Sequence, residues 1–321
     1  LLAQTDFKGP IWATPATIQL AGLILRDAAK VQSSDTDRQN KRNRRRGHPD
    51  EKPLYTPEDV ETVLTLFKPV PYREPVAVAP GIDVIWSEAG HMLGSASLQV
   101  SIREGTATRR IVFSGDLGPV HAPILKEFEP FSQADAIFLE STYGDRDHRP
   151  LAETIDEFGA IIRAAAADGG HILIPTFAVG RAQMLTLLLA SMFRKHEVPP
   201  FPVFLDSPMA IEAARILSSH PELYDEELRT FLSTGNLDED LRTLKTTATS
   251  EQSRSINDID GPCLVMAGAG MCNAGRILHH LKHHLWKPST NVVIVGFQSN
   301  GSLGRRLVDG EKEVRILGET V

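Results

Sequence analysis

The sequence predicts an α/β protein, and two patterns carry that prediction. In the first half, three apolar runs each end in glycine, serine and one ionisable residue, as expected of buried strands followed by tight turns. Later in the chain, apolar strand-like runs alternate with longer helical segments, which is typical of a parallel sheet flanked by helices. The change of pattern near Asp147 predicts two domains, residues 1–146 and residues 147–321.

The elements before Asp147 start with a short apolar strand at residues 10–13. Thr14 is placed to cap a helix that has Pro15 in its first turn, and Thr56 with Asp59 forms a capping box for a second helix. Five strands with alternating or continuous apolar residues then follow. They are expected at residues 76–78, 82–86, 98–102, 109–113 and 136–139.

The elements after Asp147 alternate between the two types, as a parallel sheet with helical crossovers requires. Helices are expected at residues 155–167, 181–194, 211–218 and 277–285, and strands at residues 172–174, 203–205, 263–266 and 292–295. Residues 223–261 are polar and mostly helical, with no clear site.

Composition narrows the class of protein. The 321 residues are 41% hydrophobic, which suffices for a sizeable core. Cys263 and Cys272 form neither a disulfide framework nor a zinc pattern, and no apolar run reaches a membrane span, so we expect a cytoplasmic protein without membrane contact. A net charge of −7 argues against a surface covered in basic residues, but it does not exclude RNA binding, which needs only a local positive groove.

Three ionisable residues follow successive strands: His91, Asp116 and Glu140. Imidazole and carboxylate ligands in a chain with almost no cysteine suit Zn²⁺ or a similar metal. The alternative is that each is an ordinary hydrogen-bonded turn residue. The repeated arrangement of strand, turn and ionisable residue favours the metal site without excluding the alternative.

Two clusters of polar residues have competing interpretations. Residues 30–52 are strongly basic, which predicts either a solvated helix face or loop, or an arm that contacts phosphates. No aromatic residue is interleaved there, so base stacking is not indicated. His279 with His283, and His280 with His284, are spaced to bind a metal from a helix, but we favour an exposed or domain-facing helix.

Several turns between strands and helices in the second half could contact a polyanion. Thr176 and Ser207 precede helices whose first N–H groups form anion sites. Arg181 and Arg276 begin helices, where the dipole disfavours a cation, so a bound phosphate or an internal carboxylate partner would explain them.

Several motifs resemble one family in order along nearly the whole chain. The sequence is similar to nucleases of the metallo-β-lactamase fold that carry a β-CASP domain, the RNA-processing branch. The motifs are Ala89-Gly90-His91-Met92-Leu93-Gly94-Ser95, Phe113-Ser114-Gly115-Asp116-Leu117-Gly118, Leu139-Glu140-Ser141-Thr142-Tyr143-Gly144-Asp145-Arg146, Pro175-Thr176-Phe177-Ala178-Val179-Gly180-Arg181-Ala182-Gln183, Asp206-Ser207-Pro208-Met209-Ala210 and Gly270-Met271-Cys272-Asn273-Ala274-Gly275-Arg276.

The resemblance implies a fold and a chemistry. The fold would be a partial metallo-β-lactamase αββα sandwich followed by a β-CASP domain with a mainly parallel sheet flanked by helices. The activity would be hydrolysis of RNA with two Zn²⁺ ions in a complete site. His91 would bind one ion, Asp116 would bridge both, and Glu140 would be an acid that orients a histidine. Single-stranded RNA would bind between the two domains.

The chain departs from the family pattern at two places. The His-x-His-x-Asp-His motif, which supplies most metal ligands in the family, is absent, and so are the two last histidine motifs. The chain also begins with leucine, so we expect an internal segment of a longer reading frame. Two ligands cannot complete a two-metal site, and we therefore expect the chain as written to be inactive.

Other functions remain open at this point. A non-catalytic RNA-binding or scaffolding paralogue is the main alternative, against which His91, Asp116 and Glu140 argue. A thioester or lactam hydrolase is disfavoured by the second domain. DNA as substrate, cleavage within or from the end of a strand, and assembly as a homodimer are left open by the sequence.

Overall fold

The computed structural model describes Leu2, Thr5 and residues 7–120 and 123–321, and it confirms the predicted α/β class. The chain divides into two compact units. Unit 1 comprises Leu1–Glu140 and Ile216–Asp225, and unit 2 comprises Ser141–Arg215 and Glu226–Val321. The main division therefore lies a few residues before Asp147, and a short later segment returns to unit 1.

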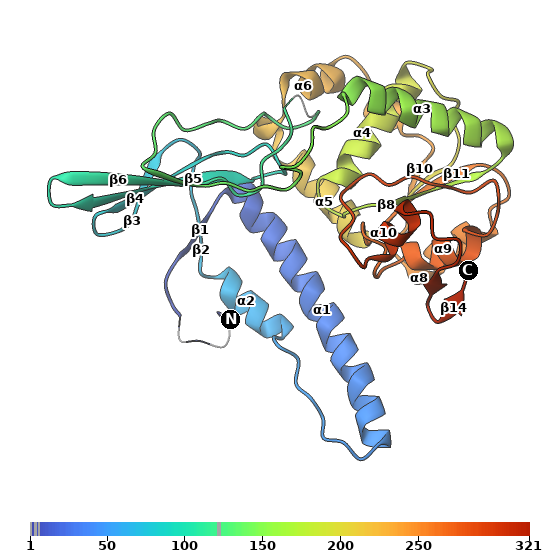
Figure 1. The fold of residues 1–321 in the computed structure, drawn as a ribbon, viewed down its shortest axis with the longest axis horizontal. Helices are drawn as coiled ribbons and strands as arrows, with labels where there is room; N and C mark the ends of the chain where they lie inside the picture. Colours follow the sequence, from blue (N-terminus) through green and yellow to red (C-terminus); the bar gives the residue numbers. More distant parts are fainter. Residues whose placement is uncertain (1, 3–4, 6, 121–122) are drawn as a thin grey trace. The chain divides into compact units, whose positions relative to one another are not determined.

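Unit 1 is built on a five-stranded mixed sheet in the order β3-β4-β5-β6-β7 (Figure 1). Neighbouring strands are antiparallel except for β6 and β7, which are parallel. A separate parallel pair joins β1 to β2. The elements are β1 (Ile11–Ala13), α1 (Pro15–Arg45), α2 (Pro57–Leu64), β2 (Phe67–Pro69), β3 (Pro75–Ala79), β4 (Ile82–Glu88), β5 (Ala96–Glu104), β6 (Ala107–Phe113) and β7 (Ala136–Phe138).

Helix α1 continues through most of the basic stretch, for which the sequence left a helix face or a loop open. Thr14 caps its start by accepting a hydrogen bond from the Thr17 N–H, and Pro15 occupies the first turn. The Asn40 side chain donates to the Glu51 carbonyl at 2.9 Å, and the Glu51 N–H donates back to the Asn40 side-chain oxygen at 2.8 Å. This pair holds the returning chain against the helix, so the basic residues form a solvated helix face.

The sheet of unit 1 has a small core and an exposed edge. Val84 and Trp86 of β4 are buried together with Val70, because alternate residues of a strand point to the same face. At the other end of the sheet, Ile137 and Phe138 of β7 are 63% and 61% exposed. The last strand of this sheet is therefore apolar and uncovered within unit 1.

Unit 2 is built on a five-stranded sheet in which every pairing is parallel, in the order β10-β9-β11-β8-β12. Its helices are α3 (Leu151–Asp168), α4 (Arg181–Arg194), α5 (Pro208–Ser218), α6 (Glu226–Ser233), α7 (Leu237–Asp240), α8 (Ser250–Ser255), α9 (Ile277–His284) and α10 (Leu303–Val308), with a short 3-10 turn at Ile256–Asp258. The end of α5 and the 3-10 turn at Pro221–Leu223 lie in the segment that belongs to unit 1. Its strands are β8 (His171–Pro175), β9 (Val203–Asp206), β10 (Leu244–Thr246), β11 (Cys263–Ala267) and β12 (Asn291–Val292), and a hairpin joins β13 (Arg315–Ile316) to β14 (Glu319–Thr320).

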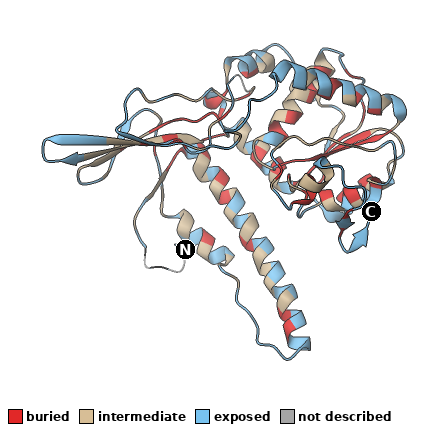
Figure 2. Ribbon diagram, viewed as in Figure 1, coloured by how far each residue is buried: buried red, intermediate tan, exposed pale blue. Residues whose placement is uncertain are grey.

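Both faces of this parallel sheet are covered, as the continuous apolar strands predict. Ile172 and Ile174 of β8 pack into a cluster with residues of α3 and α4. Leu173, between them, packs into a second cluster with Ile277 and Leu281 of α9. Figure 2 shows the resulting concentration of buried residues in the strands of unit 2. The predicted parallel sheet with flanking helices is confirmed.

Among the residues that the structure describes, no helix combines the length and the apolar character that crossing a membrane requires.

Candidate functional site

The loop that carries His91 connects β4 to β5. The Ser95 hydroxyl accepts hydrogen bonds from the backbone N–H groups of His91 and Met92, both at 3.2 Å, which closes the loop into a tight turn. The hydroxyls of Thr14 and Thr17, at the start of α1, donate to the Gly94 carbonyl at 2.8 and 2.7 Å. The first turn of the helix therefore fixes the end of the His91 loop.

The loop that carries Asp116 follows β6 and packs directly on the His91 loop. The Gly118 N–H donates to the Ala89 carbonyl at 2.8 Å. A Cβ atom on Gly118 would lie 1.9 Å from the Gly90 carbonyl oxygen, so only glycine permits this approach of the two backbones. Because the two loops are joined backbone to backbone, His91 and Asp116 are held on the same side of unit 1.

Glu140 follows β7 and supports the Asp116 loop. Its carboxylate accepts the Leu117 N–H at 2.7 Å, next to Asp116. Its own N–H donates to the Ser114 hydroxyl at 3.0 Å, and the Ser97 hydroxyl donates to the Ser114 carbonyl at 2.6 Å. These bonds connect the ends of β5, β6 and β7, so the structure brings the three predicted residues to neighbouring loops of one sheet.

His91 and Asp116 face one another across the two loops. The His91 Nε2 and Asp116 Oδ2 atoms are 3.9 Å apart, and their side chains are 40% and 74% exposed. With Zn–N and Zn–O bonds of about 2.1 Å, two ligands of a tetrahedral ion lie roughly 3.4 Å apart, so a small movement of these exposed side chains would bring both atoms to one ion. The donor types therefore fit zinc. No group of three His, Cys, Asp or Glu side chains placed to hold a metal exists among the described residues, so only two ligands are present.

Asp116 and Glu140 also line an open depression of about 670 Å³. Its remaining walls come from the ends of β6 and β7, including Phe113 and Phe138, whose rings stack with centroids 4.9 Å apart. Of the two candidate ligands, Asp116 thus lines a partly apolar surface.

Glu88, directly before the motif that contains His91, lies near the site and was given no role by the sequence analysis. It ends β4, is 6% exposed, and accepts the Gly90 N–H at 3.0 Å. Burial raises the pKa of this carboxyl, while the Gly90 N–H acts in the opposite direction. A buried acid two residues before a positive-φ glycine stabilises the turn that presents His91.

The four predicted phosphate-binding residues lie in unit 2 and differ in what they contact. Thr176 is buried, and its hydroxyl donates to the Phe177 carbonyl at 3.3 Å. The Ser207 hydroxyl accepts the Ala210 N–H at 3.2 Å, which caps the start of α5. Arg181 is exposed and has no carboxylate partner in the part of the chain that the structure describes.

Arg276 is held by an internal ion pair, which was the alternative to phosphate contact. Its Nη1 donates to Asp206 at 2.7 Å and to the Thr247 carbonyl at 2.9 Å, and its Nη2 donates to the Ala248 carbonyl at 3.0 Å. Three of the five guanidinium donors are therefore used within the protein. The role of Arg276 in phosphate binding stays a prediction.

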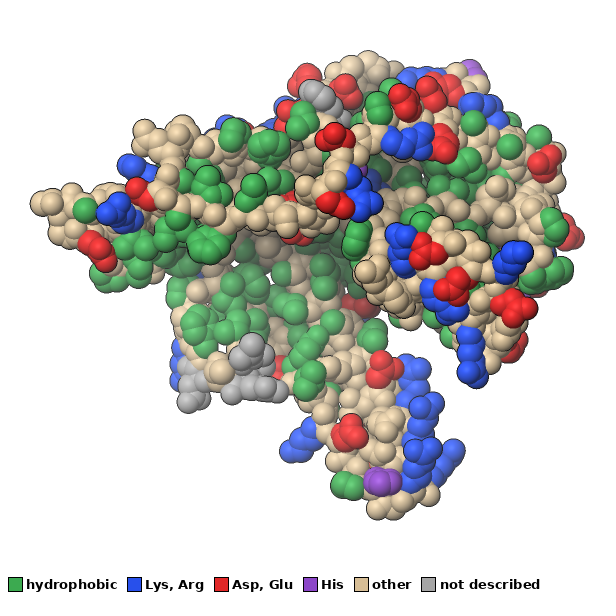
Figure 3. Space-filling model, in the orientation of Figure 1, with side chains coloured by type: hydrophobic (Ala, Val, Ile, Leu, Met, Phe, Trp, Pro, Cys, Tyr) green, Lys and Arg blue, Asp and Glu red, His purple; other side chains and the backbone are tan. Residues whose placement is uncertain are grey.

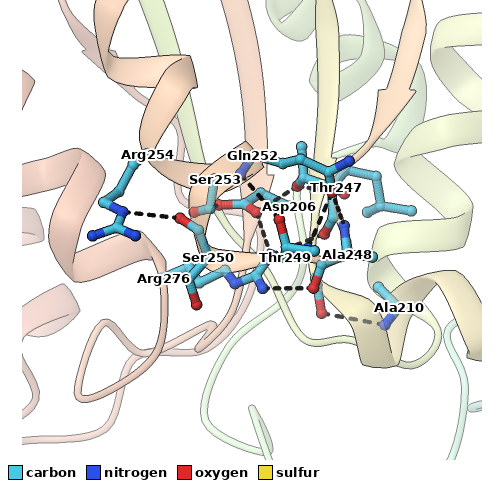
Figure 4. A network of polar contacts seen from close by, with 12 residues as sticks. Asp206, Ala210, Thr247, Ala248, Thr249, Ser250, Gln252, Ser253, Arg254 and Arg276 are labelled. Atoms are coloured by element: carbon cyan, nitrogen blue, oxygen red, sulfur yellow. Dashed lines mark hydrogen bonds and ion pairs between the residues drawn. The ribbon is translucent and has the colours of Figure 1, made fainter.

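Asp206 is the centre of a polar network that sequence reasoning missed (Figure 4). It ends β9, is fully buried, and accepts hydrogen bonds from the hydroxyls of Thr247 and Ser253 at 2.5 and 2.6 Å, besides the Arg276 bond. The His280 Nε2 lies 2.7 Å from its second oxygen. Burial opposes ionisation, but the bonds from His280, Ser253, Thr247 and Arg276 outweigh it and hold the pKa of the carboxyl well below its usual range.

The histidine helix is exposed on one face, as the sequence favoured, because His279 and His283 are exposed, and it is buried on the other. His280 and His284 are buried in unit 2 and face the sheet, because α9 packs on β8 and β11. Asn257 contacts both rings, at 3.0 Å from His280 Nδ1 and 3.3 Å from His284 Nε2, and the His284 ring stacks on His171. These contacts account for both rings without a metal.

The sequence was compared with protein-family models and with known proteins. The family model of the Beta-Casp domain matches residues 182–307, which lie in unit 2 except for the Ile216–Asp225 segment. Ribonuclease TTHA0252 of Thermus thermophilus is 38% identical over 323 residues, covering 100% of this chain and 68% of that protein.

Archaeal proteins are also similar over nearly the whole chain. Transcription termination factor FttA of Cenarchaeum symbiosum is 30% identical over 330 residues, and FttA of Methanosarcina mazei is 29% identical over 326 residues. The alignments cover 99% of this chain but 47% and 48% of those proteins. The chain thus spans about two thirds of the ribonuclease and about half the length of the termination factors.

Proposed function

Because the chain belongs to the metallo-β-lactamase/β-CASP family of RNA-processing proteins, we propose that its function is metal-dependent hydrolysis of phosphodiester bonds in RNA. The observation that supports this most directly is the pair of zinc-compatible donors, His91 and Asp116, on two loops joined backbone to backbone. We assign residues 1–146 to a metallo-β-lactamase domain and residues 147–321 to a β-CASP domain.

His91 and Asp116 would hold zinc, two ions being expected in a complete site, with Asp116 between them. Such ions lower the pKa of bound water and neutralise the charge that develops on phosphorus oxygens. Glu140 holds the Leu117 N–H and so fixes the loop on which Asp116 is presented. In this proposal Glu140 also orients a histidine that protonates the leaving oxygen.

The proposed substrate is single-stranded RNA. Among the four predicted phosphate contacts, Arg181 is the best placed, because it is exposed and unpaired among the described residues. Arg276 retains its Nε–H and one Nη2–H for a phosphate oxygen, whereas Thr176 and Ser207 would have to act mainly through neighbouring backbone N–H groups. Both cysteines are free and buried, as suits the reducing cytosol in which we place this function.

We expect the 321 residues alone to hold zinc weakly and not to cleave RNA, because the described residues supply only two ligands. The remaining ligands would come from outside the described residues. Calorimetric titration with Zn²⁺ and incubation with end-labelled RNA test this directly. His91→Ala and Asp116→Asn should each abolish the weak zinc binding, while His48→Ala, on an exposed histidine away from these loops, should leave it unchanged.

Robust cleavage of RNA that His91→Ala abolishes would contradict the expected inactivity and show that the chain forms a complete catalytic site. Equal zinc binding by the chain and by the His91 and Asp116 variants would contradict the ligand assignment itself.

A non-catalytic RNA-binding or scaffolding protein is the second candidate, favoured by the absence of a third ligand among the described residues. It predicts RNA binding that neither zinc nor substitution of His91 changes.

A further inference from the structure

Two exposed phenylalanines and a tyrosine gather at one end of the parallel sheet of unit 2. Phe177 follows β8 and is 45% exposed, and Phe297 follows β12 and is 50% exposed. The Tyr143 and Phe297 rings meet edge to face, with centroids 5.6 Å apart and planes at 89°. All three residues belong to unit 2, so their arrangement is independent of unit 1.

Phe177 lies beside the segment that leads to Phe297. A Cβ atom on Gly296 would lie 3.6 Å from the Phe177 ring, and one on Gly270 would lie 2.9 Å from it. The Phe177 ring therefore rests on glycine backbone rather than in an apolar core. The 45% exposure of Phe177 leaves part of the ring accessible to a flat ligand.

The position of these rings is the usual place for a ligand in this type of fold. In open parallel sheets, ligands bind outside the carboxyl ends of the strands, and β8 and β12 both end here. Tyr143 has a φ of +60°, which is unfavourable for a bulky side chain and is tolerated most often at functional sites. Core packing does not explain three large rings held in this way at the surface.

A cation accompanies the rings. Arg181 is the first residue of α4, four positions after Phe177, and has no carboxylate partner among the described residues. A positive charge at this end of a helix is unfavourable unless an anion or a π face offsets it. The surface therefore combines π faces with an unpaired cation, as single-stranded nucleic acid sites do.

We propose that Tyr143, Phe177 and Phe297 form a stacking surface for the bases of single-stranded RNA, with Arg181 contacting the phosphate between them. This inference rests on the proposed function and names how its substrate is held. Every base presents a π face, so the surface would accept any sequence, with preference for purines because they stack over a larger area.

The test is equilibrium binding measured by fluorescence anisotropy, with the whole chain and with EDTA present so that no metal contributes. The probes are a labelled oligoadenylate and an abasic oligomer of the same length and charge. Phe177→Ala and Phe297→Ala should each weaken oligoadenylate binding about tenfold and leave abasic binding unchanged. Phe177→Trp, which keeps an aromatic face, should bind within about twofold of the parent.

Trp286→Ala is the matched control, because Trp286 is a 67% exposed aromatic residue of unit 2 outside this cluster. It should not change the affinity for either oligomer. Phe177→Leu, which keeps apolar volume but loses the π face, should behave as Phe177→Ala.

Equal losses for the oligoadenylate and the abasic oligomer, or no loss in the phenylalanine variants, would overturn the stacking surface. Failure of the chain to bind any RNA would overturn it as well. The ribonuclease proposal fails separately: base-dependent RNA binding, together with zinc binding that His91→Ala and Asp116→Asn leave unchanged, keeps the stacking surface and rejects the proposed metal site.

Discussion

At the scale of single residues, Asp206 shows how unit 2 uses a buried charge. Its carboxylate receives bonds from two hydroxyls and one guanidinium and contacts one imidazole, and these groups come from β9, from the segment after β10, and from α8 and α9. A buried carboxylate is tolerated only when its oxygens are satisfied in this way. The network therefore joins four segments at the carboxyl end of β9.

Replacing Asp206 with asparagine should lower the free energy of unfolding by about 3–5 kcal/mol, because Arg276 and His280 lose a buried ionic partner. Urea denaturation followed by circular dichroism measures this. Asp168→Asn, an exposed carboxyl at the end of α3, is the control and should change stability by less than about 0.5 kcal/mol. Equal losses of stability in the two variants would show that the Asp206 network contributes little to the free energy of unfolding.

The buried imidazole of His284 should make the folded protein less stable in acid. Burial, with the charges of His171, Lys287, His280 and His283, lowers the pKa of His284 to about 3. The unfolded chain takes up this proton near pH 6.5, whereas the folded chain does not until about pH 3, so stability is lost as the pH falls between these values. The loss per pH unit is at most about 1.4 kcal/mol for one such histidine.

The His284→Asn variant should therefore lose stability less steeply than the parent between pH 7 and about pH 5, as measured by urea midpoints at several pH values. His283→Asn, on the exposed face of the same helix, should follow the parent. If the urea midpoints of the parent and of the His284 variant fall equally steeply with pH, the lowered pKa of His284 is wrong.

At the scale of elements, β7 is an apolar edge strand that pairs only with β6 among the described strands. Exposed apolar edges promote association between chains. Ile137→Lys should reduce self-association, measured by light scattering over a range of concentrations, because a lysine on an edge strand disfavours pairing with another chain. Val308→Lys, at an exposed position of α10, adds the same charge away from any sheet edge and should have no such effect.

The end of α1 is the most basic surface element, with Lys41, Arg42, Arg45 and Arg46 all exposed (Figure 3). Arg44 differs, since it pairs with Asp50. If this face contacts RNA phosphates, Arg42→Glu with Arg46→Glu should weaken RNA binding and flatten its dependence on salt. Lys195→Glu with Lys312→Glu makes the same change of net charge elsewhere, and an equal effect would indicate a general charge effect only.

The sequence predicts elements and loops better than it predicts networks. His91, Asp116 and Glu140 could be found because each follows its own apolar strand, so the signal is local. Asp206 and His280 are 74 positions apart, and serine and threonine near residue 250 carry no distinctive pattern, so their convergence depends on the sheet order. The basic residues 30–52 fit a helix face and a loop equally well in the sequence, and the bonds between Asn40 and Glu51 that hold the returning chain against α1 carry no sequence pattern.

At the scale of the whole molecule, the described cores of both units contain neither of the two candidate metal ligands. Their cores consist of apolar clusters on the two sheets, and the two candidate ligands lie on exposed loops. Removing metal with EDTA should therefore shift the melting temperature by less than about 1 °C, as differential scanning calorimetry would measure. A drop of several degrees, reversed by added Zn²⁺, would instead reveal a structural metal.

The Ile216–Asp225 segment gives the molecule an unusual order of assembly. Tyr224 is buried in unit 1, and the Asp225 N–H donates to the Ile124 carbonyl at 3.0 Å, although unit 1 otherwise ends at Glu140. On the ribosome, unit 1 cannot be completed until residue 225 has emerged. By then only β8 and β9 of the five strands of the second sheet exist. The first unit to be synthesised must therefore wait for a segment encoded in the middle of the second. We expect that interval to be the step at which a translating chain most needs protection from its neighbours.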